Sequence, residues 1–513
     1  MKTSRQREHQ RQRQHAARRR KRGKRSSPSG RRAPVRGQGK GQKWSRARRA
    51  AFSQTLQRTR AVVKNYPISL CVSFNGALSL FAAAFAQPSY GRFAVLVAGV
   101  VLGFRRRTVT GMLAAAGVSM LHHASFHRFF SQAVWRMDAV WKLWSAAVIQ
   151  LLPSDDPICL AGDDTVTRHT GGKIHGVGLF HDNRPGPNKA AAIRWGHSWV
   201  VLAALVPLDA WGWPGRHVAV PVWARLYRKE AHCDGESVVF RTKSELLVEM
   251  IKAFVACVPE SRSVWLFVDG GYSNASVVQH LPERVEVFGR ARADAQLYGL
   301  PPRRPKGRGR PRQRGRWLAS PQQLLAQRRG EWESRVTDRW HPVAQGKTIA
   351  LWWRVDRERP VSLVMVDCPH RRQAQEYFFT TVCDLSARAV CEQIERRWAI
   401  EVLFRDLKQH LGLETPQCRG RVAVERTGAI LFLVGGLVHY WFLSLAPEER
   451  DRLVQAYAPE WLGGFRERAP SFAAKLRLLR VAIWEHRFKC NSFPLPNVTK
   501  KADVLLRYLA AAA

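Results

Sequence analysis

The chain has 513 residues, 45% of them hydrophobic, which is too long for one ordinary domain and ample for a sizeable core. Lys and Arg number 84 against 39 Asp and Glu, a formal net charge of +45, which excludes a neutral or acidic character and indicates a polyanionic partner such as nucleic acid. The nine cysteines are scattered, without a CxxC pair, so we do not expect a structural zinc site. We expect the thiols to be reduced.

Residues 1–50 are rich in Arg, Gln and Gly and show no apolar periodicity. They hold 20 Lys and Arg against one acid, so this segment alone carries +19 and the remaining chain +26. The composition predicts a disordered basic arm that binds DNA nonspecifically. The alternative is that these residues precede the true start of the protein.

Residues 51–150 are predicted to be helical and to form a DNA-binding region. Apolar residues at helical intervals predict one helix through Phe129, Val134 and Trp141. Three apolar stretches, 68–86, 93–104 and 427–445, raise the alternative of membrane insertion. Their Ser, Asn, Gly and His residues favour packed helices instead, and the Arg-rich start is not typical of a secretion signal.

From about residue 157, short apolar runs between turn residues predict paired strands, followed by alternating strands and helices. Two of these runs end on acids, Asp163 or Asp164 after ICLAG and Asp269 after SVWLFV. A carboxylate at the end of a buried strand is costly to desolvate unless it binds a cation or another partner. The alternative is an ordinary turn or cap residue.

Residues 394–412, IERRWAIEVLFRDLKQHLG, are predicted to form one helix with two functional faces. Arg397, Glu401 and Lys408 lie at i, i+4 and i+11 and therefore share a face suited to a metal ion and a phosphate. The other face carries an apolar stripe for burial, formed by Ile400, Leu403, Phe404, Leu407 and Leu411. The alternative is a surface helix with a simple Arg–Glu ion pair.

With these residues in place, the sequence resembles DDE transposases of the RNase H-like superfamily, in the cut-and-paste group encoded by bacterial insertion sequences. That group carries the pattern Y-x2-R-x3-E-x6-K, and Arg397, Glu401 and Lys408 match its spacing. The tyrosine position holds Ile394, a departure that affects whatever contact the phenol makes. The resemblance covers roughly residues 155–445.

The family's first acid stands in a D-x-T pattern, which Asp163 satisfies, with Asp164 as the rival. The resemblance implies that Asp163, Asp269 and Glu401 are catalytic and hold two Mg²⁺ or Mn²⁺ ions, consistent with the preference of these ions for oxygen ligands. It also implies that Arg397 and Lys408 bind DNA phosphates.

The resemblance implies an α/β fold, an RNase H-like core with a mixed sheet flanked by helices. The expected divisions are a basic arm (1–50), a helical DNA-binding region (51–150), the first part of the core (155–300), a β-rich insertion (301–375), the last part of the core (376–420) and a C-terminal helical region (421–513). Trp340, Trp352 and Trp353 of the insertion are candidates for stacking on a flipped base, although each is also an ordinary core candidate.

The expected function is metal-dependent cleavage at the ends of the element and strand transfer into target DNA. The expected partners are double-stranded DNA and a second copy of the chain, without a membrane, in the bacterial cytoplasm at the nucleoid. The alternatives are a catalytically inactive or domesticated DNA-binding derivative and a nuclease without strand transfer.

Deleting residues 1–50 is expected to flatten the dependence of nonspecific DNA affinity on salt, because fewer counterions are released. The measurement is the slope of log K against log salt for the full and the shortened chain on one duplex. An unchanged slope would mean that the arm does not touch DNA.

Overall fold

The computed structural model describes residues 70–490, apart from residues 105, 155, 183–191, 234–238, 303–311, 328–330, 337–341, 368–374 and 458–468. The described part belongs to one compact unit, Ser53–Ala513. The basic arm expected at residues 1–50 lies outside the described residues.

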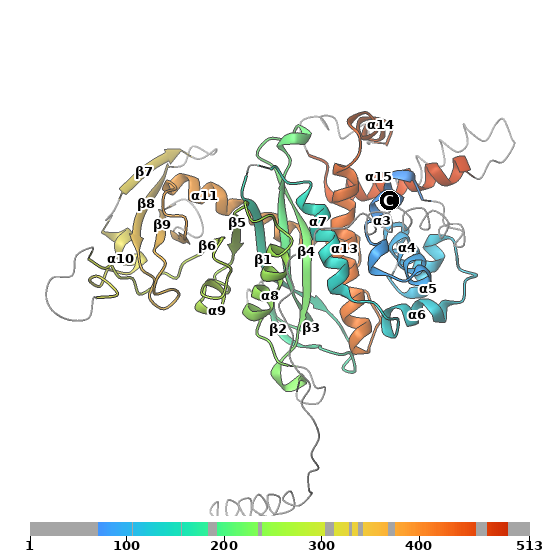
Figure 1. Ribbon diagram of the computed structural model, residues 1–513, viewed down its shortest axis with the longest axis horizontal. Coiled ribbons are helices and arrows are strands. Elements are labelled where there is room, and N and C mark those ends of the chain that lie inside the picture. The colour runs from blue at the N-terminus through green and yellow to red at the C-terminus, as the bar shows by residue number, and fades with distance from the viewer. Residues whose placement is uncertain are drawn as a thin grey trace, which may run out of the picture. The chain divides into compact units, whose positions relative to one another are not determined.

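Helices precede the first strand, as the sequence predicts (Figure 1). They are α3 (Val72–Ser79), η2 (Ala82–Ala84), α4 (Gln87–Leu102), α5 (Val109–Ala116), α6 (His123–Ser131) and α7 (Met137–Ile149). The prediction of one helix through Phe129 and Trp141 is wrong, because α6 ends before α7 begins. In the break, Trp135 stacks on Phe129 at 5.0 Å and donates its indole N–H to the Phe129 carbonyl oxygen, while Val134 is 97% exposed.

A ten-stranded mixed sheet forms the centre of the fold (Figure 1). Its order is β2-β3-β1-β5-β6-β10-β9-β8-β7, with β4 paired to β3. The strands are β1 (Ile158–Arg168), β2 (Gly178–Asp182), β3 (Ala192–Pro207), β4 (His217–Tyr227), β5 (Val264–Val268), β6 (Val285–Arg290), β7 (Glu331–Val336), β8 (Pro342–Ala350), β9 (Val361–Asp367) and β10 (Gln375–Thr380). β1, β5 and β6 run parallel, and the other neighbours are antiparallel. The predicted mixed sheet flanked by helices is confirmed.

The remaining helices follow the strands, some as connections and some as a C-terminal group (Figure 1). They are η4 (Asp209–Trp211), η5 (Glu230–His232), α8 (Lys243–Val255), α9 (Ala275–Val278), α10 (Pro321–Ala326), α11 (Ala387–Glu395), α12 (Trp398–His410), α13 (Arg421–Leu443), α14 (Pro447–Tyr457) and α15 (Phe472–Cys490). α8 begins with a capping box, in which Thr242 and Glu245 each accept from the other's backbone N–H.

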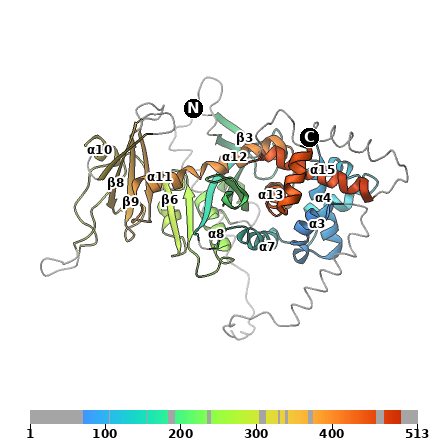
Figure 2. The ribbon, with the colours of Figure 1, turned by 90° about the horizontal axis from the view of Figure 1, so that it is seen from above.

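Helices cover both faces of the sheet around β1. Alternate residues of a strand point to opposite faces, so neighbouring residues of β1 face different helices. Gly162 faces α8, since a Cβ there would lie 2.8 Å from Leu247 Cδ1. Thr165 pairs with Trp199 of β3, and Trp199 packs against Gly428 of α13 on the other face. α11 contacts β6, β8, β9 and β10, and α12 contacts β1 and β4, so the two successive helices run across the sheet (Figure 2).

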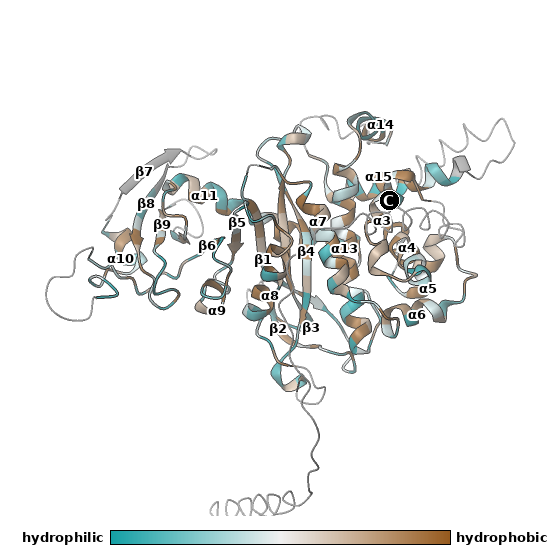
Figure 3. Cartoon of the chain, viewed as in Figure 1, coloured by the Kyte–Doolittle hydropathy of each residue, from teal (hydrophilic) through white to brown (hydrophobic). Residues whose placement is uncertain are grey.

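α13 is apolar enough and long enough to cross a membrane, and it is strongly hydrophobic in Figure 3. However, 78% of its most apolar window is buried inside the protein, against β4, α3, α4, α6 and α15. Gly428 and Gly435 bring it close to its neighbours, as any Cβ at either position would lie within 2.5 Å of Trp199 or Leu407. Contacts within the fold therefore account for the hydrophobicity of residues 427–445.

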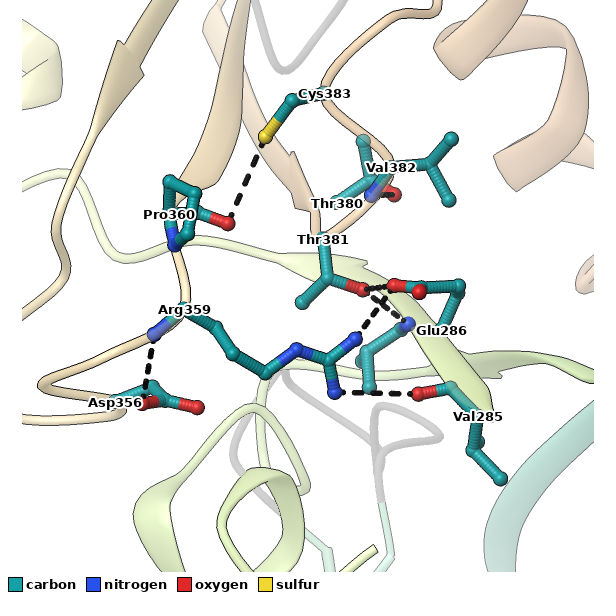
Figure 4. Close-up of polar contacts among 10 residues, drawn as sticks. Val285, Glu286, Asp356, Arg359, Pro360, Thr380, Thr381, Val382 and Cys383 are labelled. Carbon is teal, nitrogen blue, oxygen red and sulfur yellow. Dashed lines mark hydrogen bonds and ion pairs between the residues drawn. The ribbon is translucent and has the colours of Figure 1, made fainter. Parts of the chain in front are cut away.

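The segment expected to be a β-rich insertion contains β7, β8 and β9 and joins the sheet through β10. A polar cluster fastens this junction to β6 (Figure 4). Glu286 of β6 accepts from Arg359 Nη2 at 2.7 Å and from the Thr381 hydroxyl, and Thr381 Oγ1 accepts from the Val287 N–H at 2.9 Å. These contacts hold the segment against β6, which pairs with β5, and Asp269 directly follows the last residue of β5.

A matched pair of glycine substitutions tests the close approach of α13 to the sheet. A Cβ at Gly428 would lie 2.1 Å from Trp199 Cζ2, whereas nothing lies within 4 Å of one at Gly76 in α3. Gly428→Ala is expected to lower the free energy of unfolding by about 1–3 kcal/mol through overpacking. Gly76→Ala is expected to raise it by roughly 0.5–1 kcal/mol through helix propensity. Urea unfolding followed by Trp fluorescence measures both, and equal shifts would contradict the packing described.

Candidate active site

The parallel pairing of β1 with β5 places two of the predicted acids side by side. The last residues in register are Gly162 and Val268, so the next along each strand are Asp163 and Asp269. The prediction that both acids end strands is correct only for Asp269. β1 continues through Asp163 to Arg168, paired with β3, because β3 is long enough to accompany it beyond the end of β5.

The third predicted acid reaches Asp163 through an arginine. Arg397 Nη1 lies 3.1 Å from Asp163 Oδ2, and Arg397 Nη2 lies 2.8 Å from Glu401 Oε1. The Arg397 side chain is only 14% exposed, and a planar guanidinium suits two carboxylates at once. The structure therefore brings together residues 163 and 401, which are far apart in the sequence, on one cation.

The segment that carries Glu401 is two helices and not the single helix predicted. α11 ends at Glu395, and α12 begins at Trp398 with Arg397 as its N-cap residue. The i, i+4 ion pair of Arg397 and Glu401, given above as the alternative to a metal and phosphate face, forms despite the break because Arg397 keeps right-handed helical dihedrals, φ −56° and ψ −31°. The predicted apolar stripe is buried in full, with exposures of 0–7%: Ile400, Leu403, Phe404, Leu407 and Leu411.

Asp164, the rival for the first acid, points to the opposite face of β1. Its carboxylate accepts from Lys243 Nζ at 2.6 Å, from the Tyr272 hydroxyl at 3.0 Å and from the Ser198 hydroxyl at 3.3 Å. Lys243 is the first residue of α8, which covers that face. Asp164 is thus held by three donors, while Asp163 is the one that shares Arg397 with Glu401.

One cavity of about 700 Å³ is lined by all three predicted acids and by Lys408, the predicted phosphate-binding lysine. Lys243, Tyr272 and Arg405 also line it and were not among the predicted site residues. Tyr272 follows Asp269 closely in FVDGGY, and Arg405 lies between Glu401 and Lys408, so proximity to the motifs was an available signal. Lys243 had none, because only the fold brings α8 to β1.

Burial dominates the electrostatics of Asp163. It raises the pKa of that carboxyl to about 7, against the Arg397 guanidinium, which lowers it, and with the neighbouring charges of Asp164 and Asp269, which raise it further. Burial and the same acids raise the pKa of the Tyr272 hydroxyl, so Tyr272 is a hydrogen-bond donor to Asp164. The cavity therefore concentrates negative charge beyond what Arg397 and Lys243 neutralise.

A surplus of carboxylate oxygens is the donor chemistry that hard divalent cations prefer. In the described part of the chain, however, no group of three or more His, Cys, Asp or Glu side chains is arranged as a metal site. Arg397 supplies the counter-charge between Asp163 and Glu401 instead. The carboxylates are of the chemical type that binds a divalent cation. A divalent cation between Asp163 and Glu401 would supply the counter-charge that the Arg397 guanidinium supplies in its absence.

The tryptophans of the β-rich segment differ in environment. Trp352 is buried and packs edge-on against Phe379, as a core residue does. Trp353 is partly exposed, with the Arg314 guanidinium 4.9 Å and the Arg357 guanidinium 5.5 Å from its ring centre. Trp340 lies outside the described residues.

Two sequence families match the chain. Residues 81–348 match the family described as DDE superfamily endonuclease, a span that covers more than half of the chain and includes Asp163 and Asp269. Residues 326–444 match the family described as archaeal putative transposase ISC1217, a span that includes Arg397, Glu401 and Lys408. No curated protein matches the chain.

The raised pKa of Asp163 predicts a pH-dependent gain in stability for Asp163→Asn in metal-free protein. The folded state binds this proton up to about pH 7, whereas a free carboxyl releases it near 3.8. Wild-type stability therefore falls as the pH rises through this range, and Asn, which cannot ionise, escapes the loss. The stability of the variant relative to wild type should rise between pH 4 and pH 8, by up to about 4 kcal/mol.

The control is Asp294→Asn. Asp294 is exposed, and its hydrogen bond from Arg292 lowers its pKa, so this variant should show no such rise with pH. Thermal unfolding in EDTA at several pH values provides the measurement. A difference between Asp163→Asn and wild type that stays constant with pH would contradict a buried, proton-binding Asp163.

Proposed function

Because the chain belongs to the DDE superfamily of endonucleases, as a transposase of an insertion sequence, we propose that it moves its element by cut-and-paste transposition. It cleaves DNA at the ends of the element and joins those ends to target DNA. The observation that carries the proposal is the Arg397 guanidinium between Asp163 and Glu401, with Asp269 beside them in register. This arrangement gathers the three acids of the motif at one cavity.

Asp163, Asp269 and Glu401 would hold the divalent ions, Mg²⁺ or Mn²⁺. Two such ions, when bound, would activate the attacking oxygen and stabilise the leaving oxygen of the phosphodiester. Asp163 is favoured over Asp164 because it shares a cation with Glu401, whereas Lys243, Tyr272 and Ser198 hold Asp164.

The cations around the cavity have separate tasks. Arg397 keeps Asp163 and Glu401 together in the absence of metal, and it binds phosphate oxygens through its planar fork when DNA is present. Lys408 lies two turns along α12 from Glu401, on the same cavity, and neutralises a phosphate next to the cleavage point. The acids thereby face a positively charged rim that attracts the DNA backbone.

The partners are double-stranded DNA at the element ends and at the target, consistent with the net charge of +45. Joining two ends requires both to be held together, which favours a homodimer in the DNA complex. The protein acts in the bacterial cytoplasm, at the nucleoid and without a membrane.

A second candidate function is that of an inactive or domesticated transposase that only binds DNA. The retention of all three acids around one cavity favours the active enzyme, because a binding protein gains nothing from concentrating carboxylates next to a polyanion. A nuclease without strand transfer is distinguished by its indifference to paired element ends.

Glu401→Gln is expected to abolish Mg²⁺-dependent cleavage while DNA affinity stays near the wild-type value, because the change removes a charge and keeps the volume. Lys408→Ala should weaken cleavage without abolishing it, since it removes one phosphate contact. The assay is cleavage of a duplex that carries the inverted repeats flanking the gene, with affinity measured in EDTA. Undiminished Mg²⁺-dependent cutting by Glu401→Gln would refute the assignment.

A further inference from the structure

A second cavity, of about 640 Å³, borders the other flank of α12. Trp398, Val402 and Arg405 line both cavities. They stand at i, i+4 and i+7 and so form one ridge along the helix. Glu401 and Lys408 lie on the side of the first cavity, and Leu403 and Asp406 lie on the side of the second. We call the line of Trp398, Val402 and Arg405 the α12 ridge.

The second cavity has more cationic than acidic side chains in its lining. Its charged lining residues are Arg216, Arg396, Arg405, Lys475, Glu392, Glu395 and Asp406. Two of the acids already have arginine partners, because Arg405 lies 3.0 Å from Asp406 and Arg388 lies 2.8 Å from Glu392. Arg216 is exposed, and its side chain has no ion-pair partner among the residues that the structure describes. The balance is positive.

Lys475 of α15 is the least satisfied of these groups. Its side chain is fully buried, and an ammonium has three protons to donate. Among the described residues it makes one hydrogen bond, to His439 Nδ1 at 3.2 Å, and its Nζ lies 5.5 Å from the centre of the Phe442 ring. Burial lowers the pKa of Lys475 to about 7 and that of His439 well below its usual range. The Asp406 carboxylate raises the pKa of Lys475 in turn, and an anion in the cavity would favour the charged amine further.

We propose that this cavity binds a phosphate group of the DNA strand that passes over the α12 ridge into or out of the acid-lined cavity, with Arg216 and Arg396 as the contacting cations and the positive charge of the buried Lys475 behind them. The inference rests on the proposed function and names a second DNA contact for it. The two cavities would bind different parts of the same DNA strand. The acid-lined cavity would bind the reacting phosphodiester together with its metal ions, and the second cavity would bind a neighbouring phosphate without a metal ion.

DNA is favoured over a free phosphate ion because of the ridge between the cavities. Trp398 and Arg405 are exposed along it, so a strand leaving the first cavity meets an aromatic ring and a guanidinium before it reaches the second. Aromatic and arginine side chains are the surfaces on which DNA strands rest. A free phosphate ion would not contact the α12 ridge, so the exposed Trp398 and Arg405 would be unexplained.

The experiment measures DNA binding by the full chain in EDTA, where no cleavage is required. The variants are Arg216→Gln, at an exposed position, and Lys475→Met, which keeps the length of the buried side chain. The matched control is Lys252→Gln, which removes one charge from the exposed side of α8, outside both cavities. A parallel arm follows the thermal stability of DNA-free protein with added inorganic phosphate.

Arg216→Gln is expected to lower the slope of log K against log salt by up to about 0.9, the contribution of one phosphate contact. Lys475→Met is expected to lower it by less, because Lys475 acts from behind the contact, and the control leaves the slope unchanged. Slopes equal to wild type for folded Arg216→Gln and Lys475→Met would overturn the proposal. So would an effect confined to stabilisation by inorganic phosphate, because the site would then hold a free ion. A wild-type protein that binds DNA and never cuts it would overturn the enzymatic function and leave this inference standing.

Discussion

The main constraint on this structure is that several carboxylates lie close together at low solvent exposure. Asp163, Asp269 and Asp164 repel one another, and burial adds to the cost, as the raised pKa of Asp163 shows. Arg397 offsets this on one face of β1 by binding Asp163 and Glu401, and Lys243 offsets it on the other by binding Asp164. Each cation also joins a helix to the strand, so the contacts that compensate the charge are the contacts that assemble the site.

The sheet and its helices bring these groups to one place. Parallel pairing sets Asp269 beside Asp163, although more than a hundred residues separate them. α11 and α12 cross the sheet in succession, and the break between them leaves Arg397 at the start of α12, next to β1. The buried stripe of α12 and the close approach of α13 through Gly435 then fix the helix against the core. Glu401 consequently lies on a rigid element and not on a loop.

The charged side chains around α12 differ between its two flanks. One flank borders the cavity lined by the three acids of the motif, and the other borders the cavity lined by Arg216, Arg396 and Lys475. In the proposed function, the same helix would separate the site of the divalent ions from the site of a neighbouring DNA phosphate. A transposase needs both, because the phosphodiester under attack and its neighbours on the strand make opposite electrostatic demands.

The sequence alone determined the parts of this protein that are local. The period of the apolar residues predicted the buried face of α12, the i, i+4 spacing placed Arg397 and Glu401 on one face of the helix, and the motif with its charge surplus predicted a DDE transposase that binds DNA. These follow from spacing along the chain, which a helix or strand converts directly into a face.

Only the tertiary structure decided which of two adjacent aspartates joins Glu401, that the motif helix breaks before Trp398, and that β1 continues past its acids. It also brought in Lys243 and buried Lys475 beside His439. The physical reason is that strand register and the packing of distant helices set the environment of each charge. The sequence does not distinguish Asp163 from Asp164 as the first acid of the site. The fold does, because the two side chains point to opposite faces of β1 and contact different residues there.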